Sequence, residues 1–166
     1  MAQFAARNER EESPVEDQLV KIYRCSKVVK GGRNFSFAGL VVVGDRKGQV
    51  GYGYGKANEV PQAVEKANKE ARRSLVSVNL KGTTIPHQVS GRFGATKITL
   101  IPASVGTGVI AGVSARSVLE LAGIQDVLTK IYGSTSPKNV VKATMNALKL
   151  LKSREQIEKL RGVKLS

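Results

Sequence analysis

Five cationic side chains lie within thirteen residues near the start of the chain, with no acidic residue among them: Lys21, Arg24, Lys27, Lys30 and Arg33. Lysine and arginine side chains bind phosphate oxygens. Two adjacent glycines, Gly31 and Gly32, allow main-chain N–H groups to approach the same phosphates closely. The residue types and their spacing therefore indicate binding of a phosphate backbone. The plain alternative is a solvated strand edge that lysines protect from aggregation.

Aromatic side chains beyond this run offer ring faces on which unpaired bases can stack, although alternation along a strand places some of them in a core. The aromatic candidates are Phe35, Tyr52 and Tyr54. A second set of basic residues lies at helical spacing, so a loop and a helix can bind one phosphate backbone at two places. The remaining basic candidates are Lys56, Lys66, Lys69, Arg72, Arg73 and Arg92.

The net charge supports a polyanionic partner. Among 166 residues, 27 are Lys or Arg and 13 are Asp or Glu, which gives a formal net charge of +14. So large an excess opposes compaction unless an anion neutralises it. No stretch approaches the ~18 consecutive apolar residues of a spanning helix, so we expect no membrane contact. RNA is favoured over DNA because no segment resembles a major-groove recognition helix, whereas compact α+β domains often bind RNA by shape.

Catalytic and metal-binding chemistry finds little support in the sequence. Cys25 and His87 are the only residues of their types. A single cysteine excludes an internal disulfide and a multi-cysteine zinc site, and the distance between the two residues along the chain disfavours a nucleophile–base pair. We therefore expect no catalytic residue, no metal, no cofactor and no small-molecule substrate.

Two glycine-rich segments suggest nucleotide binding at first sight. Residues 51–57, GYGYGKA, lack the P-loop glycine at position 50 and the Ser or Thr at position 57. Residues 106–111, GTGVIA, match the dinucleotide fingerprint, and Asp126 lies twenty residues beyond the first glycine. In the dinucleotide fold that acid ends a strand, whereas here it begins a predicted one. The other interpretation is close helix–sheet packing with an exposed glycine surface for a partner.

Hydrophobic periodicity predicts two small α+β units. The first is expected to contain strands within 19–29, 35–45 and 49–57 and a helix over 60–78. The second is expected to contain two strands that turn at 91–94, a helix over 106–123, a strand over 126–133 and helices beginning near 136 and 153. The helix boundaries depend on Asn58 and Ser136 as N-caps, Gly123 as a stop, and a capping box of Ser153 with Gln156.

These patterns divide the chain into three segments. We expect an acidic flexible leader over 1–18, an RNA-binding α+β domain over 19–80, and a C-terminal α+β domain over 81–166 with a short terminal helix. Residues 1–20 carry a net charge of −3, whereas residues 21–100 carry +11. The start of the chain lacks the apolar core of a secretory signal, which favours a cytoplasmic or organelle-interior location.

Four stretches resemble, in order, the signature motifs of the small-subunit ribosomal protein five family in its bacterial or organellar form. They are SKVVKGGRNFSF, LVVVGDRKGQVGYGYGKANEVPQAVEKA, IPASVGTGVIAG and YGSTSPKNVVKAT. The resemblance covers about residues 17–165 and leaves only the acidic leader outside.

The resemblance implies more than the residues alone. It implies an N-terminal domain similar to a double-stranded-RNA-binding domain, and a C-terminal four-stranded sheet with two helices and a left-handed βαβ crossover. It also implies binding of small-subunit rRNA at the body–head junction, contacts with small-subunit proteins four and eight, a place along the mRNA entry path and an influence on decoding accuracy. The family residues that face protein four match Gly106, Thr107, Gly108 and Arg116.

We therefore predict a non-catalytic structural protein of the small ribosomal subunit. The first alternative is a free RNA-binding regulator that uses the same basic face. The second is a small nucleotide-dependent enzyme built around residues 106–111.

Overall fold

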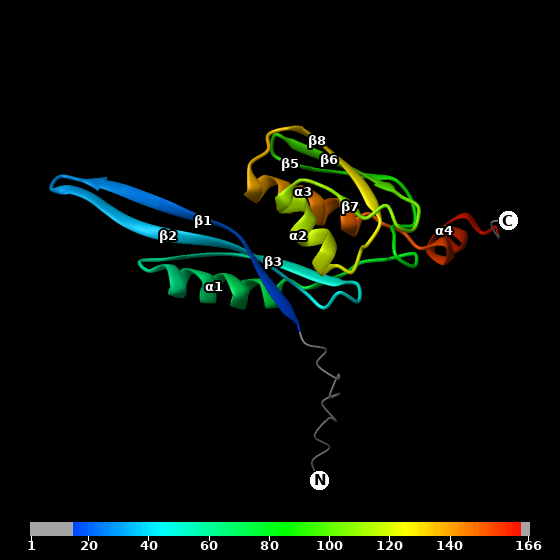
Figure 1. Cartoon of the computed structure of the whole chain (residues 1–166), viewed down its shortest axis with the longest axis horizontal. Helices are drawn as coiled ribbons and strands as arrows, with labels where there is room; N and C mark the ends of the chain where they lie inside the picture. The colour runs from blue at the N-terminus through cyan, green and yellow to red at the C-terminus, as the bar shows by residue number, and fades with distance from the viewer. Residues whose placement is uncertain (1–14, 164–166) are drawn as a thin grey trace, which may run out of the picture.

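Residues 15–163 are described by the computed structural model of the chain. Of the leader expected over 1–18, residues 1–14 lie outside the described part, and the first strand already begins at Glu16. The described residues form two α+β units, one of which carries a long β-hairpin that projects from the body (Figure 1). This arrangement confirms the predicted α+β class with two domains.

The first unit is an antiparallel sheet with one helix packed on it. Its strand order is β1–β2–β3–β4, formed by β1 (Glu16–Val29), β2 (Gly32–Gly44), β3 (Gln49–Ala57) and β4 (Val76–Ser77). The helix α1 (Val60–Arg73) buries Ala63, Ala67 and Ala71. The predicted β-β-β-α order is confirmed, and the two-residue strand β4 is an addition that no periodicity could indicate.

The alternation of glycine and tyrosine in β3 explains how closely α1 approaches the sheet. Gly51, Gly53 and Gly55 all face α1, where an added Cβ would clash with a carbonyl oxygen of the helix. Alternation along the strand sends Tyr52 and Tyr54 to the opposite face. The glycines that suggested a nucleotide loop are therefore packing positions.

The second unit is a four-stranded sheet with two helices, followed by a short helix. Its strand order is β5–β6–β8–β7, formed by β5 (Val89–Phe93), β6 (Thr96–Pro102), β7 (Val109–Ile110) and β8 (Val127–Gly133). Neighbouring strands are antiparallel except β7 and β8, which are parallel and connected through α2 (Val113–Leu121). The helices α3 (Pro137–Lys149) and α4 (Arg154–Arg161) follow.

The helix predicted over 106–123 begins too early. Gly106 and Gly108 have φ angles of +90° and +78°, which a right-handed helix excludes. These residues form a loop that leads into β7, and α2 begins only at Val113. The G-x-G sequence therefore does not enter a helix directly, as a dinucleotide fingerprint requires.

The first helix is also shorter than predicted, and its N-cap is Glu59 rather than Asn58. Ser74 follows its last turn and ties the helix end to β3. The Ser74 hydroxyl donates to the main-chain carbonyl of Tyr52 at 2.7 Å and accepts from the N–H of Tyr52 at 3.2 Å. The apolar residue Val78 beyond this anchor packs in the core that the two units share.

Local capping signals predicted the other helix ends correctly. Ser136 is the N-cap of α3. Ser153 and Gln156 form the capping box of α4, which ends at the left-handed Gly162. Gly123 follows the end of α2 with a φ of +89°.

The two units are joined by a continuous core and by main-chain hydrogen bonds. Leu40 of β2 and Leu119 of α2 belong to the same buried cluster. In the turn between β2 and β3, the N–H groups of Arg46 and Gly48 donate to the last carbonyls of α2 at 3.0 and 3.1 Å. The turn is therefore bonded to the second unit by its own backbone.

Candidate nucleic-acid interface

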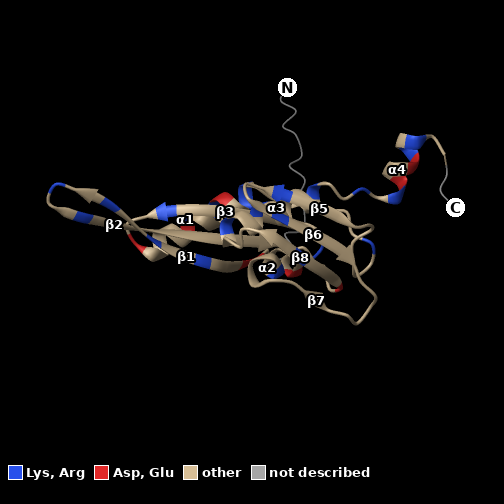
Figure 2. Cartoon of the chain, turned by 90° about the horizontal axis from the view of Figure 1, so that it is seen from above, with Lys and Arg blue, Asp and Glu red and all other residues tan. Residues whose placement is uncertain are grey.

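The most prominent surface feature is a two-stranded arm, which we define as residues 25–36 at the tip of the β1–β2 hairpin. Pairing of β2 with β3 ends at Phe37, so the arm extends beyond the rest of the sheet (Figure 1). Figure 2 shows Lys and Arg residues along the hairpin and at its tip. No residue of the arm is acidic.

The arm carries three of the predicted cations, and both glycines lie at its tip, Gly31 in the turn and Gly32 at the start of β2. Lys27, Lys30 and Arg33 are exposed. Lys30 and Gly31 form the two-residue turn, because the ladder resumes at Gly32. The arm therefore presents cations on both sides of a turn whose main chain is open to a partner.

The predicted residues next to the arm are arranged differently. Lys21 and Arg24 are exposed on β1. The Arg24 guanidinium lies over the ring of Phe35, 3.9 Å from its centroid, and Phe35 is 47% exposed. A cation thus covers part of the ring, which leaves less of it for stacking on a base than the sequence suggests.

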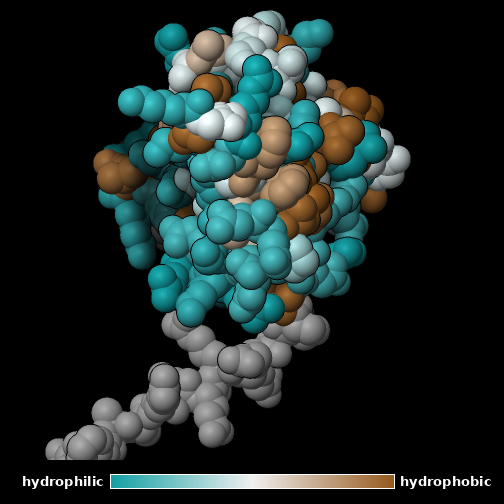
Figure 3. Space-filling model, turned by 90° about the vertical axis from the view of Figure 1, so that its left-hand side faces the viewer, coloured by the Kyte–Doolittle hydropathy of each residue, from teal (hydrophilic) through white to brown (hydrophobic). Residues whose placement is uncertain are grey.

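The arm has no core of its own. Val28 is 72% exposed at its tip, and a two-stranded hairpin without a packed face is marginally stable in water. Figure 3 views the molecule from the arm end and shows a mostly hydrophilic face with separate hydrophobic patches. A partner that neutralises the cations and covers the apolar side chains would stabilise the arm.

Gly31 allows a test of close main-chain approach. Its φ is not positive, and no atom lies within 4 Å of a Cβ built on it, so the fold does not require glycine there. We expect Gly31→Val to leave the free energy of unfolding within about 0.5 kcal/mol of the parent. RNA affinity should fall about ten-fold or more, because a lost hydrogen bond to a charged group is worth about 1.5–3 kcal/mol. Urea unfolding and filter binding to small-subunit rRNA measure the two quantities, and unchanged affinity would show that phosphates do not approach the turn.

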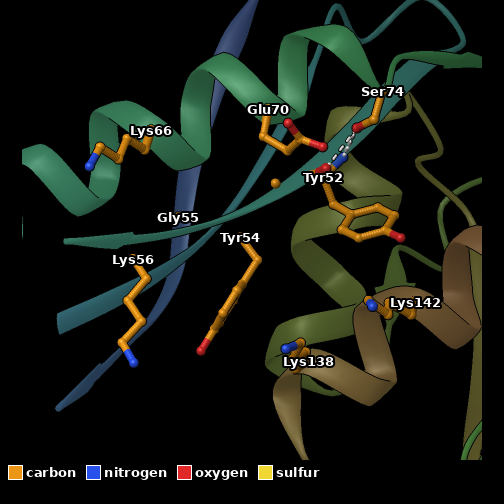
Figure 4. A pocket seen from close by; sticks show the side chains of 10 residues that line it. Tyr52, Tyr54, Gly55, Lys56, Lys66, Glu70, Ser74, Lys138 and Lys142 are labelled. Atoms are coloured by element: carbon orange, nitrogen blue, oxygen red, sulfur yellow. Dashed lines mark hydrogen bonds between the residues drawn. The ribbon is translucent and has the colours of Figure 1, made fainter. Parts of the chain in front are cut away.

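A second group of predicted residues lines a trough between the two units, which β3 and α1 bound on one side and α3 on the other. Its volume is about 490 Å³. Figure 4 shows the side chains around it, including those of Tyr52, Tyr54, Lys56, Lys66, Lys138 and Lys142. The fold therefore brings four predicted RNA contacts together with two lysines from α3.

Lys138 and Lys142 are absent from the predicted set. They lie four residues apart near the start of α3 and therefore on one face of the helix. This spacing is the signal that identifies them as a pair. Nothing local in the sequence indicates that α3 lies opposite β3.

Two of the trough lysines, Lys138 and Lys142, lie close to aromatic rings. Lys138 Nζ lies 3.8 Å from the ring centroid of Tyr54, and Lys142 Nζ lies 4.6 Å from that of Phe93 and 5.9 Å from that of Tyr52. Tyr23 meets the Tyr54 ring at a centroid distance of 6.3 Å. Burial raises the pKa of the Tyr54 phenol above its ordinary value of 10.0. The rings position the lysines here and are less available to a base than predicted.

The remaining predicted RNA contacts lie elsewhere on the surface. Lys69, Arg72 and Arg73 are exposed on α1 outside the trough, and Arg92 is exposed on β5. The structure thus divides the predicted residues among the arm, the part of β1 next to it, the trough and the outer surfaces of α1 and β5, instead of bringing them into one patch.

The loop that contains Gly106 uses its main-chain N–H groups internally. The carboxylate of Asp126, which is 3% exposed, accepts from the N–H groups of Gly106 at 2.9 Å and Gly108 at 3.0 Å. In a dinucleotide site the acid would bind a ribose and the amides would bind the pyrophosphate. Here the two groups bind each other, which contradicts the nucleotide-binding alternative.

The same loop presents a surface with apolar character. The Thr107 hydroxyl donates to the carbonyl of Ser104 at 2.7 Å, and the Arg116 side chain is exposed and donates to the carbonyl of Ala111 at 3.3 Å. Three large apolar side chains nearby are exposed by 84%, 53% and 77%: Val105, Ile110 and Val113. Exposed apolar side chains that recur within 105–113 are a feature of interaction sites, so this stretch suits a protein partner.

Asp126 makes the stability of this loop depend on pH. The N–H of Gly108 first, and the Thr83 side chain and other loop amides next, hold the pKa of Asp126 below its ordinary value of 3.8. A carboxyl whose pKa falls on folding stabilises the folded state above the unfolded pKa, and this contribution disappears as the pH drops through the folded pKa. Asp126→Asn keeps the shape and removes the charge. We expect its melting temperature to lie below that of the parent at pH 7, and the difference to shrink as the pH falls below 3.8 toward the lower pKa that Asp126 has in the folded state. A pH-independent difference in thermal unfolding would contradict this role.

Two further classes of site find no support among residues 15–163. No group of three or more His, Cys, Asp or Glu side chains there could hold a metal ion. In the same range, no helix has the length and apolar character needed to cross a membrane.

Comparisons with known proteins agree with this geometry. Two family models match the chain: ribosomal protein S5, N-terminal domain, over residues 15–79, and ribosomal protein S5, C-terminal domain, over residues 91–161. The chain is 56% identical over 160 residues to small ribosomal subunit protein uS5 of Rhodopirellula baltica, and the alignment covers 94% of this chain and 90% of the relative. It is 54% identical over 149 residues to the uS5 protein of Idiomarina loihiensis, with 90% of each covered.

These matches confirm the resemblance drawn from the four sequence motifs. Members of the matched family are structural components of the small ribosomal subunit and not enzymes, which agrees with the prediction of a non-catalytic role. The chain belongs to the ribosomal protein S5 family, the small ribosomal subunit proteins uS5.

Proposed function

We propose that this structural protein of the small ribosomal subunit binds rRNA mainly through its arm. One observation carries the proposal: residues 25–36 project beyond the body with exposed cations, an open glycine turn and no acidic residue. A charged ribbon without a core gains stability from a polyanion, and rRNA phosphates supply the opposite charge.

The finer placement follows from the family resemblance. We propose that the arm lies at the body–head junction of the subunit, near the mRNA entry path, where it influences decoding accuracy. The surface formed by Gly106, Thr107, Gly108 and Arg116 would face small-subunit protein four, and the exposed Val105 and Val113 beside it support a protein contact. Protein eight would be a further neighbour. The location is then the ribosome, in the cytoplasm or in an organelle interior.

Sedimentation of a cell extract tests the assignment directly. We expect the chain to migrate with the small subunit through a sucrose gradient and to leave it only under conditions that dissociate ribosomal proteins. A chain recovered mainly in the free pool, with RNA bound to the same arm, would favour the free RNA-binding regulator instead.

A further inference from the structure

We propose that the trough between the two units holds an unpaired RNA strand, with its phosphates between lysines of both domains and the open edge of β3. The inference goes beyond the arm and rests on the proposed function only in taking RNA as the partner. It assigns a second contact with a different preference, for single-stranded rather than folded RNA.

The first support is the edge of β3. The main-chain N–H and C=O of Tyr52 both bond to the Ser74 hydroxyl, on the side of β3 away from β2. In an antiparallel ladder every second residue points its N–H and C=O to the same side. Tyr54 and Lys56 therefore direct theirs toward the same edge. Within residues 15–163, β4 pairs with this edge only at Gln49 and Val50.

The second support is the charge around that edge. Lysines from three elements surround it: Lys56 from β3, Lys66 from α1, and Lys138 and Lys142 from α3. Glu70 is the one acidic residue among the lining side chains, so the trough keeps a clear cationic excess. Cations beside outward-pointing N–H groups form a site for the oxygens of successive phosphates.

The third support is that the lysines are already positioned. Lys138 and Lys142 are half-buried. The Tyr54 ring of β3 lies 3.8 Å from Lys138 Nζ, and the Phe93 ring of β5 lies 4.6 Å from Lys142 Nζ. A side chain held in this way loses less rotamer freedom on binding than a free surface lysine. These two lysines should therefore contribute more per charge than exposed ones.

The size of the trough favours single-stranded RNA. Its volume of about 490 Å³ is that of a small-ligand site, which suits individual nucleotides and not a double helix. The competing occupant is an extended acidic peptide that adds a strand to β3. The lining holds four lysines and one acidic side chain, Glu70. This cationic excess makes the phosphate backbone the better match, because a peptide strand gains mainly from main-chain pairing.

Nuclear magnetic resonance on the full-length protein tests the site. Hexauridylate should shift the amide resonances of Tyr54 and Lys56, and a short RNA duplex should not. The double variant Lys138→Gln, Lys142→Gln should bind hexauridylate more weakly, with a log–log salt slope reduced by about 1.4 for two phosphate contacts. Lys149→Gln with Lys152→Gln, two exposed lysines near the end of α3, is the matched control and should leave the slope unchanged.

Each outcome decides between the proposals. If hexauridylate shifts only amides of the arm, the trough inference is wrong and the function proposed for the arm stands. If the amide resonances of the trough shift with hexauridylate while the arm does not bind folded rRNA, the inference holds and the proposal for the arm fails. Stronger shifts of Tyr54 and Lys56 with hexaglutamate than with hexauridylate would replace RNA by a peptide strand. Should the double variant fold poorly, the amide shifts of the parent protein still decide.

Discussion

Gly123→Ala is expected to lower the free energy of unfolding by about 2–5 kcal/mol. Gly123 has a φ of +89°, and the left-handed region costs an alanine about 1–2 kcal/mol. A Cβ at this position would also clash with the main-chain carbonyl of Arg46, and overpacking of this kind costs about 1–3 kcal/mol. The two costs add because one arises within the residue and the other from its neighbour.

The position of the clash makes relaxation difficult. Arg46 belongs to the turn whose N–H groups donate to the last carbonyls of α2. Gly123 itself completes the end of α2, where its N–H donates to the carbonyl of Glu120 and the next N–H, of Ile124, donates to Leu119, each at 3.0 Å. Moving either backbone segment therefore breaks hydrogen bonds between the units or within the helix end.

Urea unfolding followed by far-ultraviolet circular dichroism measures the change. Gly31→Ala is the matched control, because it makes the same substitution at a glycine with open space and no positive φ. The control should stay within about 0.5 kcal/mol of the parent. A Gly123→Ala protein whose free energy of unfolding is equally close to that of the parent would mean that the turn at Arg46 does not pack tightly against the end of α2.

The features that could be predicted from the sequence depend on neighbours along the chain. The capping box of Ser153 with Gln156 and the N-cap Ser136 mark helix starts through bonds or conformations within a few residues. The strands that form the arm are likewise visible as alternating and β-branched residues. The exposed cations of the arm follow from the same pattern, since a hairpin tip is open to solvent on both faces.

The features that could not be predicted depend on residues far apart in the chain. The predicted start of α2 at residue 106 was wrong because hydrophobic periodicity carries no information about the positive φ angles of Gly106 and Gly108. The glycines of β3 serve the packing of α1, which becomes evident only when Gly53 meets Ala67. The trough exists because α3 of the second unit lies against β3 of the first, and no local signal near Lys138 encodes that contact.

Replacing Lys30 and Arg33 together by alanine is expected to have the largest effect on RNA binding. Both side chains are exposed; Lys30 is in the turn of the arm, and Arg33 lies just after it on β2. If each contacts one phosphate, the double variant releases two fewer counterions on binding. The log–log slope of affinity against salt should then become shallower by about 1.4–1.8. Binding to small-subunit rRNA, measured by filter retention from about 50 to 200 mM salt, provides the slope.

The slope of log affinity against log salt distinguishes a direct phosphate contact from a general effect of the protein's net charge. Lys149→Ala with Lys152→Ala removes the same charge from exposed positions outside the arm and the trough, and should leave the slope as it is in the parent. A loss of affinity that is equal in both double variants would reflect the net charge of the protein alone. An unchanged slope in the arm variant would mean that its cations do not touch phosphates. The remaining explanation for the cations of the arm would then be that they protect an exposed strand edge from aggregation.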